Sequence, residues 1–290
     1  MNRVPQDRSR TVSVLESLPD PDWPAIARAD APVNASHLSY PVRVRDAVPG
    51  GAISLPGLAD ICQEAAARNA AGFGQGLTET MARGAVWVMS RMRLAVRRYP
   101  RLGETVTVDT WPAGLERRGA LRVYRLGVAD EPVIGAAISV WSLFDLATRR
   151  PVAAIEAVLG DVATGPCLLP VPPTVPPTVP ASPGGAARER AYPVHPAQID
   201  VYGHVNHTHL IAWCLGENAG ADGVAASPLC PRDMVIGFRA EARPDDTVVA
   251  RRDAGHPNAE RGGRVGSALT AGADGREIAR AVAWYGSAAQ

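Results

Sequence analysis

The pattern of hydrophobic and polar residues predicts one helix in each half of the chain. From Leu58 onward in "LPGLADICQEAA", apolar residues recur three or four positions apart, the spacing of an amphipathic helix. Ser54 stands where an N-cap would lie, and Pro56 fits the first turn. The same spacing returns at Leu210, Trp213, Cys214 and Glu217. Because this second stripe ends on a charge, we expect its helix to be shorter, or to place Glu217 near a polar cavity.

After each helix the apolar positions alternate, which predicts strands. In "RMRLAVRR", residues 91–98, the apolar residues alternate with arginines, a pattern typical of a strand with one face in water. Further strands are predicted in "GETVTVDTW", "ALRVYRLGV", "VIGAAISVWSLFDL" and, more faintly, in "DMVIGFRAEARPDDTVVARR", "GRVGSALTAG" and "REIARAVAWYG". Short turns between strands imply antiparallel neighbours, because parallel ones need long crossovers. One helix must then cover the sheet of its half, so we predict an α+β layer made twice.

The two halves also align with each other. "YPVRVRDAVPGGAISLPGLADICQE" begins at Tyr40, and "YPVHPAQIDVYGHVNHTHLIAWCLGE" begins 152 residues later at Tyr192. Between them, residues 166–185 hold too many prolines for a helix or a central strand and are read as a semi-rigid spacer. We therefore predict four segments: a loosely held arm (1–38), a first domain (39–160), a proline-rich linker (161–187) and a second domain (188–290).

Composition narrows the possible chemistry. The chain of 290 residues has a formal net charge of +1, which gives no signal for binding to nucleic acid or an anionic membrane. All 30 basic residues are arginine, which excludes a Schiff-base lysine and a phosphate-loop lysine. The four scattered cysteines fit reduced thiols. We find no signal-peptide core and no membrane span, and we expect a cytoplasmic protein.

One stretch, residues 197–217, concentrates polar chemistry immediately before the second predicted helix. Its candidates are Asp200, His204, Asn206, His207 and His209. The three histidines could bind a metal, although their spacing matches no metal motif that we know. Asp200 and Asn206 could equally be ordinary turn and cap residues. A third interpretation is hydrolysis, in which a carboxylate at the mouth of a helix activates water or attacks an acyl carbon.

The internal repeat favours the hydrolytic interpretation. At the offset of 152, Asp200, His204 and Asn206 fall opposite Val48, Ala52 and Ser54. The polar set is thus confined to one half, whereas residues that the fold itself requires would be expected in both. His204 could assist the carboxylate with a proton or orient it. Backbone N–H groups of the first helical turn would point at the carbonyl oxygen.

These residues also resemble a known family. "DVYGHVNH", residues 200–207, is similar to the D-x-N-x-H-V-N-N motif of fatty acyl–acyl carrier protein thioesterases of plants and bacteria. "AVWVMSRMRLAVRRYPRLGETVTVDTWPAG", residues 85–114, resembles that family's W-V-x-S-R-M…R-Y-P…G-[DE]-T-V…T-W-P block. The resemblance runs from Tyr40 to Trp284, apart from the spacer. It implies a tandem (double) hot-dog fold and hydrolysis of fatty acyl thioesters in fatty acid biosynthesis, without metal or organic cofactor.

The resemblance also assigns roles to residues. It implies that Asp200 is the catalytic carboxylate, as nucleophile or as activator of water, and that His204 is the catalytic histidine. Glu241 matches a glutamate that helps to place water. Tyr202 departs from the family, because an asparagine is usual at its position. We expect Tyr202, Gly203 and Asn206 to bind or position the substrate.

Several alternatives stay open. "D-x-Y-G-H-V-N" is also similar to single hot-dog acyl-CoA thioesterases, so the substrate could be a thioester of acyl carrier protein or of coenzyme A. The chain could instead be a non-catalytic acyl-binding protein, or a dehydratase of 3-hydroxyacyl thioesters. It could be a monomer, as a pseudo-dimer of its halves, or a homodimer. The first half either lines an acyl tunnel or is only a scaffold. An acidic carrier protein could meet surface arginines, or these could be an ordinary solvated face: Arg91, Arg93, Arg97, Arg98, Arg117 and Arg118.

Overall fold

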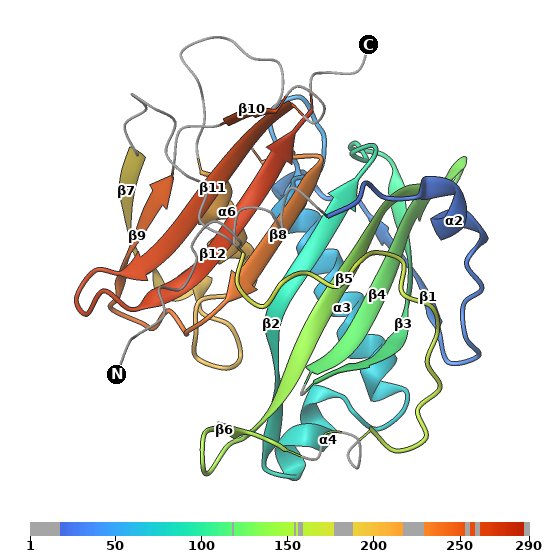
Figure 1. The fold of residues 1–290 in the computed structure, drawn as a ribbon, viewed down its shortest axis with the longest axis horizontal. Coiled ribbons are helices and arrows are strands. Elements are labelled where there is room, and N and C mark those ends of the chain that lie inside the picture. Colours follow the sequence, from blue (N-terminus) through green and yellow to red (C-terminus); the bar gives the residue numbers. More distant parts are fainter. Residues whose placement is uncertain are drawn as a thin grey trace, which may run out of the picture.

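One antiparallel sheet of twelve strands runs through both halves (Figure 1). The computed structural model describes residues 18–117, 119–153, 155, 159–176, 188–216, 229–252, 256–258 and 262–286. The first half contributes β1 (Ser36–Pro41), β2 (Ala85–Val96), β3 (Thr105–Glu116), β4 (Gly119–Val128), β5 (Glu131–Asp145) and β6 (Arg150–Pro151). The second contributes β7 (Arg188–Pro193), β8 (Asp233–Phe238), β9 (Thr247–Arg252), β10 (His256–Asn258), β11 (Gly262–Ala271) and β12 (Glu277–Tyr285). The order is β1-β3-β4-β5-β2-β8-β12-β11-β9-β7, with β6 and β10 off this path.

The two predicted helices are present among the described residues, together with two short ones that the sequence pattern did not predict. They are α2 (Trp23–Arg28), α3 (Leu55–Ala71), α4 (Leu77–Ala82) and α6 (His207–Leu215), with short 3₁₀ turns η1 (Val44–Asp46) and η2 (Pro196–Gln198). Ser54 caps α3, since its Oγ accepts a hydrogen bond from the Gly57 N–H at 3.1 Å. As predicted, the second helix is the shorter one, with 9 residues against 17. Glu217 lies outside the described residues.

The internal repeat is confirmed element by element. β1 and β7, η1 and η2, and the first residues of α3 and α6 all lie 152 positions apart. The bridge between Ala47 and Ile53 recurs at the same offset between Ile199 and Val205. Along the sheet, each half runs inward from its edge strand, β1 or β7, to β2 or β8, which pair with each other at the centre. The chain therefore folds as two copies of one α+β unit joined into a single sheet.

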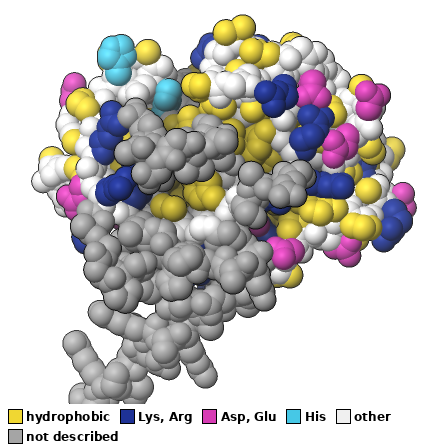
Figure 2. Space-filling view, turned by 90° about the horizontal axis from the view of Figure 1, so that it is seen from above, with side chains coloured by type: hydrophobic (Ala, Val, Ile, Leu, Met, Phe, Trp, Pro, Cys, Tyr) yellow, Lys and Arg dark blue, Asp and Glu magenta, His cyan; other side chains and the backbone are white. Residues whose placement is uncertain are grey.

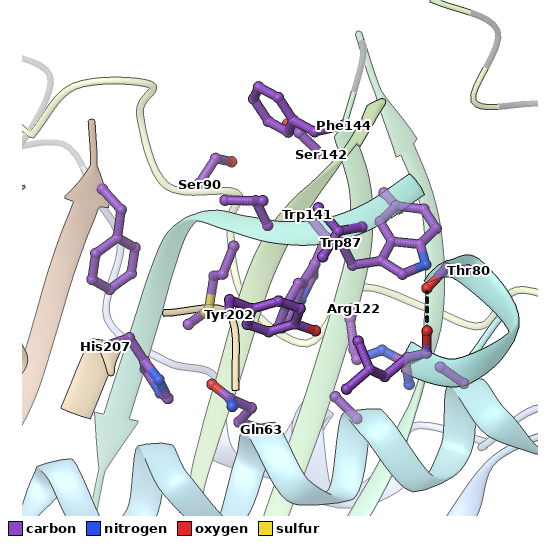
Figure 3. A pocket seen from close by; sticks show the side chains of 18 of the residues that line it. Gln63, Thr80, Trp87, Ser90, Arg122, Trp141, Ser142, Phe144, Tyr202 and His207 are labelled. Carbon is purple, nitrogen blue, oxygen red and sulfur yellow. Dashed lines mark hydrogen bonds between the residues drawn. The ribbon is translucent and has the colours of Figure 1, made fainter. Parts of the chain in front are cut away.

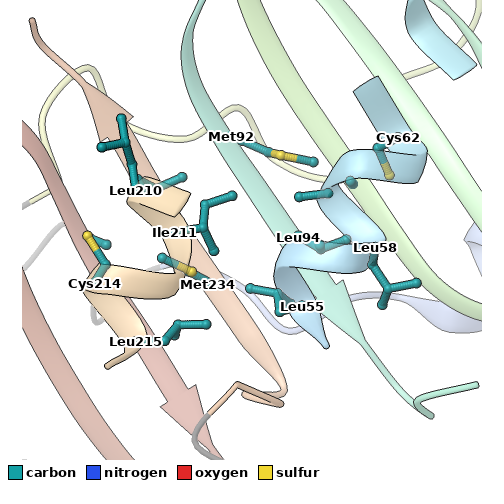
Figure 4. Close-up of a cluster of buried hydrophobic side chains, with 14 of the residues drawn as sticks. Leu55, Leu58, Cys62, Met92, Leu94, Leu210, Ile211, Cys214, Leu215 and Met234 are labelled. Carbon is teal, nitrogen blue, oxygen red and sulfur yellow. The ribbon is translucent and has the colours of Figure 1, made fainter. Parts of the chain in front are cut away.

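Both long helices lie on the same face of this sheet and share one core. Leu55 and Leu58 of α3 pack near Ile211 of α6, with Met92 of β2 and Met234 of β8 beneath them (Figure 4). All five side chains are at most 5% exposed. The two halves therefore share one hydrophobic core, which stabilises their association.

The opposite face of the first half is covered by segments predicted as arm and linker. Trp23 and Ile26 of α2 and the leucines Leu168 and Leu169 pack around Trp111 of β3. The Trp111 Nε1–H also donates to the Pro166 carbonyl at 3.1 Å. Parts of both segments therefore pack on the sheet, while residues 1–17 and 177–187 lie outside the described ones. The four segment boundaries stay a prediction.

The strand predicted to have one face in water is instead buried on both faces. Arg93 of β2 is fully buried, and it forms an ion pair with Asp233 of β8 at 2.7 Å. It also donates to the Pro19 carbonyl at 3.0 Å. Arg91 is 8% exposed and pairs with Glu116. The prediction was wrong because β2 lies at the centre of the joined sheet, where the second half and the segment around Pro19 replace water.

This burial also removes residues from the predicted carrier-binding surface. Arg91 and Arg93 cannot meet a carrier protein, and Arg98 is paired with Glu104 and Glu131. Arg118 lies outside the described residues. On the face shown in Figure 2, basic and acidic side chains are interspersed with hydrophobic ones. No helix among the described residues has both the length and the apolar character needed to cross a membrane.

Candidate active site

The polar stretch forms a tight turn that precedes α6. The Asp200 N–H donates to the His204 carbonyl at 2.8 Å, and the Gly203 N–H donates to the Asp200 carbonyl at 3.0 Å. Gly203 has φ +79, a left-handed conformation that favours glycine. The first half makes the same turn, with Gly51 at φ +83. The turn therefore belongs to the repeated fold, and only the second copy carries a carboxylate and an imidazole on it.

Backbone groups hold the Asp200 carboxylate. Its Oδ1 accepts hydrogen bonds from the Tyr202 N–H at 2.9 Å and, at 3.5 Å, from the His204 N–H. Both bonds use the same oxygen, so Oδ2 is the one left for a ligand. The turn thus fixes the orientation of the carboxylate before any substrate binds.

Glu241 is distant from His204 in the sequence but lies close to it in the structure. His204 Nε2 lies 3.0 Å from Glu241 Oε2, and both side chains are partly exposed. The Val205 N–H donates to the Ala242 carbonyl at 2.9 Å, which ties the two segments together. Arg276 steadies the second segment by donating to the Glu241 carbonyl at 3.1 Å. The structure therefore brings together Asp200, His204 and Glu241.

These residues open onto a cavity of about 860 Å³ that extends into the first half (Figure 3). Asp200, Tyr202, His204, His207 and Glu241 line it from the second half. The first half contributes Gln63 and Ala66 of α3, Trp87 and Met89 of β2, Arg122 of β4 and Trp141 of β5, among others. The first half therefore lines this cavity, whereas its role as an acyl tunnel stays a prediction.

Of the three residues predicted to position a substrate, Tyr202 alone is part of the cavity wall. Its ring points into the cavity (Figure 3). Burial, and to a lesser extent the charge of Asp200, raise its pKa, so the hydroxyl keeps its proton and can donate. Gly203 instead shapes the turn. Asn206 caps α6, its Oδ1 accepting from the Thr208 N–H at 2.9 Å.

The other two histidines of the stretch, His207 and His209, lie in different surroundings. His207 is partly buried and lies edge-on to Phe238, and burial lowers its pKa to about 4. His209 lies beside Trp213, and its pKa is also lowered, chiefly by burial. Within the part of the chain that the structure describes, no three His, Cys, Asp or Glu side chains gather as a metal site would require. His207 is thus a neutral residue of the cavity wall.

This burial predicts a pH dependence of stability. Because the pKa of His207 is about 4 in the folded chain and near 6.5 in the unfolded one, unfolding takes up a proton between these values. The contribution of His207 is therefore complete above about pH 6.5 and is lost as the pH falls toward about 4. Between about pH 7 and pH 5 the free energy of unfolding should fall by about 2 kcal/mol more than in His207→Asn, measured by urea titration. An equal fall in the free energy of unfolding of wild type and His207→Asn would contradict this prediction.

Comparison with known proteins points to one group of enzymes. Residues 34–161 match the family model described as the acyl-ACP thioesterase N-terminal domain. This chain is similar to acyl-ACP thioesterases. A chloroplastic palmitoyl-acyl carrier protein thioesterase of Cuphea hookeriana is 27% identical over 177 residues, which are 59% of this chain and 41% of the relative. A chloroplastic oleoyl-acyl carrier protein thioesterase of Coriandrum sativum is 27% identical over 176 residues, 56% of this chain and 46% of the relative. The matches span about half of these thioesterases or less.

Solved structures of thioesterases show the same fold. A putative oleoyl thioesterase of Lactobacillus plantarum superposes with a TM-score of 0.72 at 19% identity, covering 91% of this chain and 99% of the other. The 12:0-ACP thioesterase of Umbellularia californica gives 0.69 at 20% identity, with coverages of 88% and 98%. The predicted tandem hot-dog fold is confirmed.

Proposed function

We propose that this chain hydrolyses fatty acyl thioesters, with acyl carrier protein as the preferred carrier. The observation that carries the proposal is the position of Asp200 and the His204–Glu241 pair on the wall of a long, largely apolar cavity. A bound acyl chain would fill the part of the cavity in the first half. Residues 39–160 then form the acyl pocket, and residues 188–290 carry the catalytic groups.

Asp200 is the reacting group in this proposal. With the thioester carbonyl beside Oδ2, the carboxylate either takes a proton from a water molecule or attacks the acyl carbon itself. In both routes the carbon–sulfur bond breaks and the departing thiolate takes a proton. The oxygen that completes the fatty acid comes from water, directly or when the acyl–Asp200 anhydride is hydrolysed. His204, held by Glu241, is placed to orient that water.

The oxygen of the thioester carbonyl needs a hydrogen-bond donor as it gains charge. The helix-end N–H groups expected to do this are partly used, because those of Thr208 and His209 already bond to Asn206. We assign the donor role to the protonated hydroxyl of Tyr202, at the position where the family usually has an asparagine.

Tyr202→Phe should therefore lower kcat about 10²-fold, because it removes one donor to the developing oxyanion. Tyr202→Asn should recover part of the loss by restoring an N–H donor. Tyr192→Phe is the matched control, since Tyr192 stacks on Trp213 with ring centroids 5.2 Å apart and is not part of the cavity wall. Unchanged kcat in Tyr202→Phe would show that another group serves the oxyanion.

Thiol release from one series of acyl groups on both carriers tests the function. Faster turnover of the acyl carrier protein thioesters supports the proposal and a role in fatty acid biosynthesis. Faster turnover of the coenzyme A thioesters would make the chain an acyl-CoA thioesterase. Retained fatty acid without thiol release from either carrier would make it an acyl-binding protein.

A further inference from the structure

Arg122 is a buried arginine of the cavity wall whose described partners are all neutral. It lies on β4 and is 8% exposed. Its Nη1 donates to Asn69 Oδ1 at 2.7 Å and, at 3.4 Å, to Thr110 Oγ1. Burial lowers its pKa, and the phenol of Tyr124 is the only ionisable group that opposes this. Within the described part of the chain, Arg122 thus lacks a carboxylate partner.

The two buried arginines of β2 offer a contrast. Arg91 and Arg93, both on β2, are as deeply buried as Arg122, and each is paired with a carboxylate, from Glu116 and Asp233 respectively. A guanidinium remains protonated in a protein, and burying it without a counter-charge is costly. No described residue supplies a counter-charge to Arg122, and a ligand in the cavity that this residue lines could supply it.

Helix α3 gives the spacing between two parts of the cavity wall. In Figure 3, His207 lies on one side of Tyr202, and Arg122 of β4 lies on its other side, toward Thr80. Arg122 is anchored on Asn69, six residues after Gln63, which is about 9 Å along the helix axis. The side chains of α3 that line the cavity along this stretch are the small Ala66, Ala67 and Ala70. They leave an apolar passage between the two ends.

The guanidinium of Arg122 also has N–H donors that its described hydrogen bonds do not use. Its described hydrogen bonds all use Nη1, so Nε and Nη2 remain for a ligand. These two groups form the edge that binds a carboxylate through two parallel hydrogen bonds. A chain that ends in a methyl group would contact the same edge but could not accept its hydrogen bonds.

We propose that Arg122 determines specificity by binding a carboxylate at the far end of the acyl chain. The preferred substrates are then thioesters of acyl chains that end in a second carboxyl group, rather than in a methyl group. This inference rests on the proposed function, because it names the substrate class of the same cavity. Asn69 and Thr110 act as positioning residues, since they hold the guanidinium toward the cavity.

Selectivity between matched substrates tests the proposal. Acyl thioesters of one length, ending in methyl, hydroxyl or carboxylate, are compared on the faster carrier. In the wild type, kcat/KM for the carboxylate-ended substrate should exceed that for the methyl-ended one by at least about tenfold, and Arg122→Met should abolish this ratio. Arg122→Lys should retain part of it, since it keeps the charge but loses the paired donors. Equal ratios in wild type and Arg122→Met would overturn the proposal, and so would a preference for the hydroxyl end.

A binding measurement separates this inference from the proposed function. If no thioester is hydrolysed, the proposed function fails, and calorimetry with free acids still decides the role of Arg122. A dicarboxylic acid should bind wild-type protein at least about tenfold more tightly than the monocarboxylic acid of equal length. Equal affinities would overturn the inference, even if Arg122→Met does not fold, because this comparison needs only the wild-type protein.

Discussion

Replacing Asp200 with asparagine is expected to lower kcat for thioester hydrolysis by about 10²- to 10⁴-fold. The amide cannot take a proton from water or form the acyl intermediate, yet it matches the carboxylate in shape. Its oxygen can still accept the Tyr202 N–H bond that shapes the turn. KM should change little, because the acyl chain is bound mainly by the first half. Steady-state thiol release measures both constants.

The matched control is Asp130→Asn, which makes the same change in an exposed turn between β4 and β5. It should behave as wild type. Both variants should unfold at the wild-type urea concentration. If Asp200→Asn retained wild-type kcat, Asp200 would not be the reacting group, and the chemistry would have to be reassigned to His204 and Glu241.

Replacing Asp233 with alanine is expected to lower the free energy of unfolding by about 3–5 kcal/mol. The change leaves the guanidinium of Arg93, which is fully buried at the seam between the halves, without its counter-charge. The same seam carries the pairing of β2 with β8, across which the cavity is shared. Urea titration of the variant against wild type measures the loss.

Two further variants test whether the unpaired charge of Arg93 causes the loss of stability. The double variant Arg93→Met/Asp233→Leu removes both charges and should be more stable than Asp233→Ala, since apolar residues can replace a buried ion pair. Glu64→Ala removes the exposed partner of Arg68 on α3 and should leave the free energy of unfolding close to that of wild type. If Asp233→Ala also left it unchanged, the ion pair would not support the seam.

Much of each half could be predicted from local patterns. The stripes from Leu58 and Leu210 predicted α3 and α6, and the offset of 152 predicted the repeat that the bridges and caps confirm. Helix periodicity and cap residues depend on residues that are close together in the sequence, so they can be predicted from a single sequence. The site stretch was found in the same way, because its polar residues break the repeat.

The relation between the halves could not be predicted, because it depends on contacts between distant residues. Alternation in β2 correctly indicated a strand, but it cannot show that β8 pairs with β2 or that residues near Pro19 cover Arg93. Arg122 was missed for the same reason. Within "ALRVYRLGV" it reads as the polar face of a strand, and only the fold places it in a cavity shared with Tyr202.

Thiol release from acyl-loaded carrier protein by the purified wild-type chain decides whether the groups around this cavity hydrolyse acyl thioesters. We expect repeated turnover, with one free thiol and one fatty acid formed for each thioester consumed. A chain that binds fatty acid but releases no thiol from either acyl carrier protein or coenzyme A would contradict it.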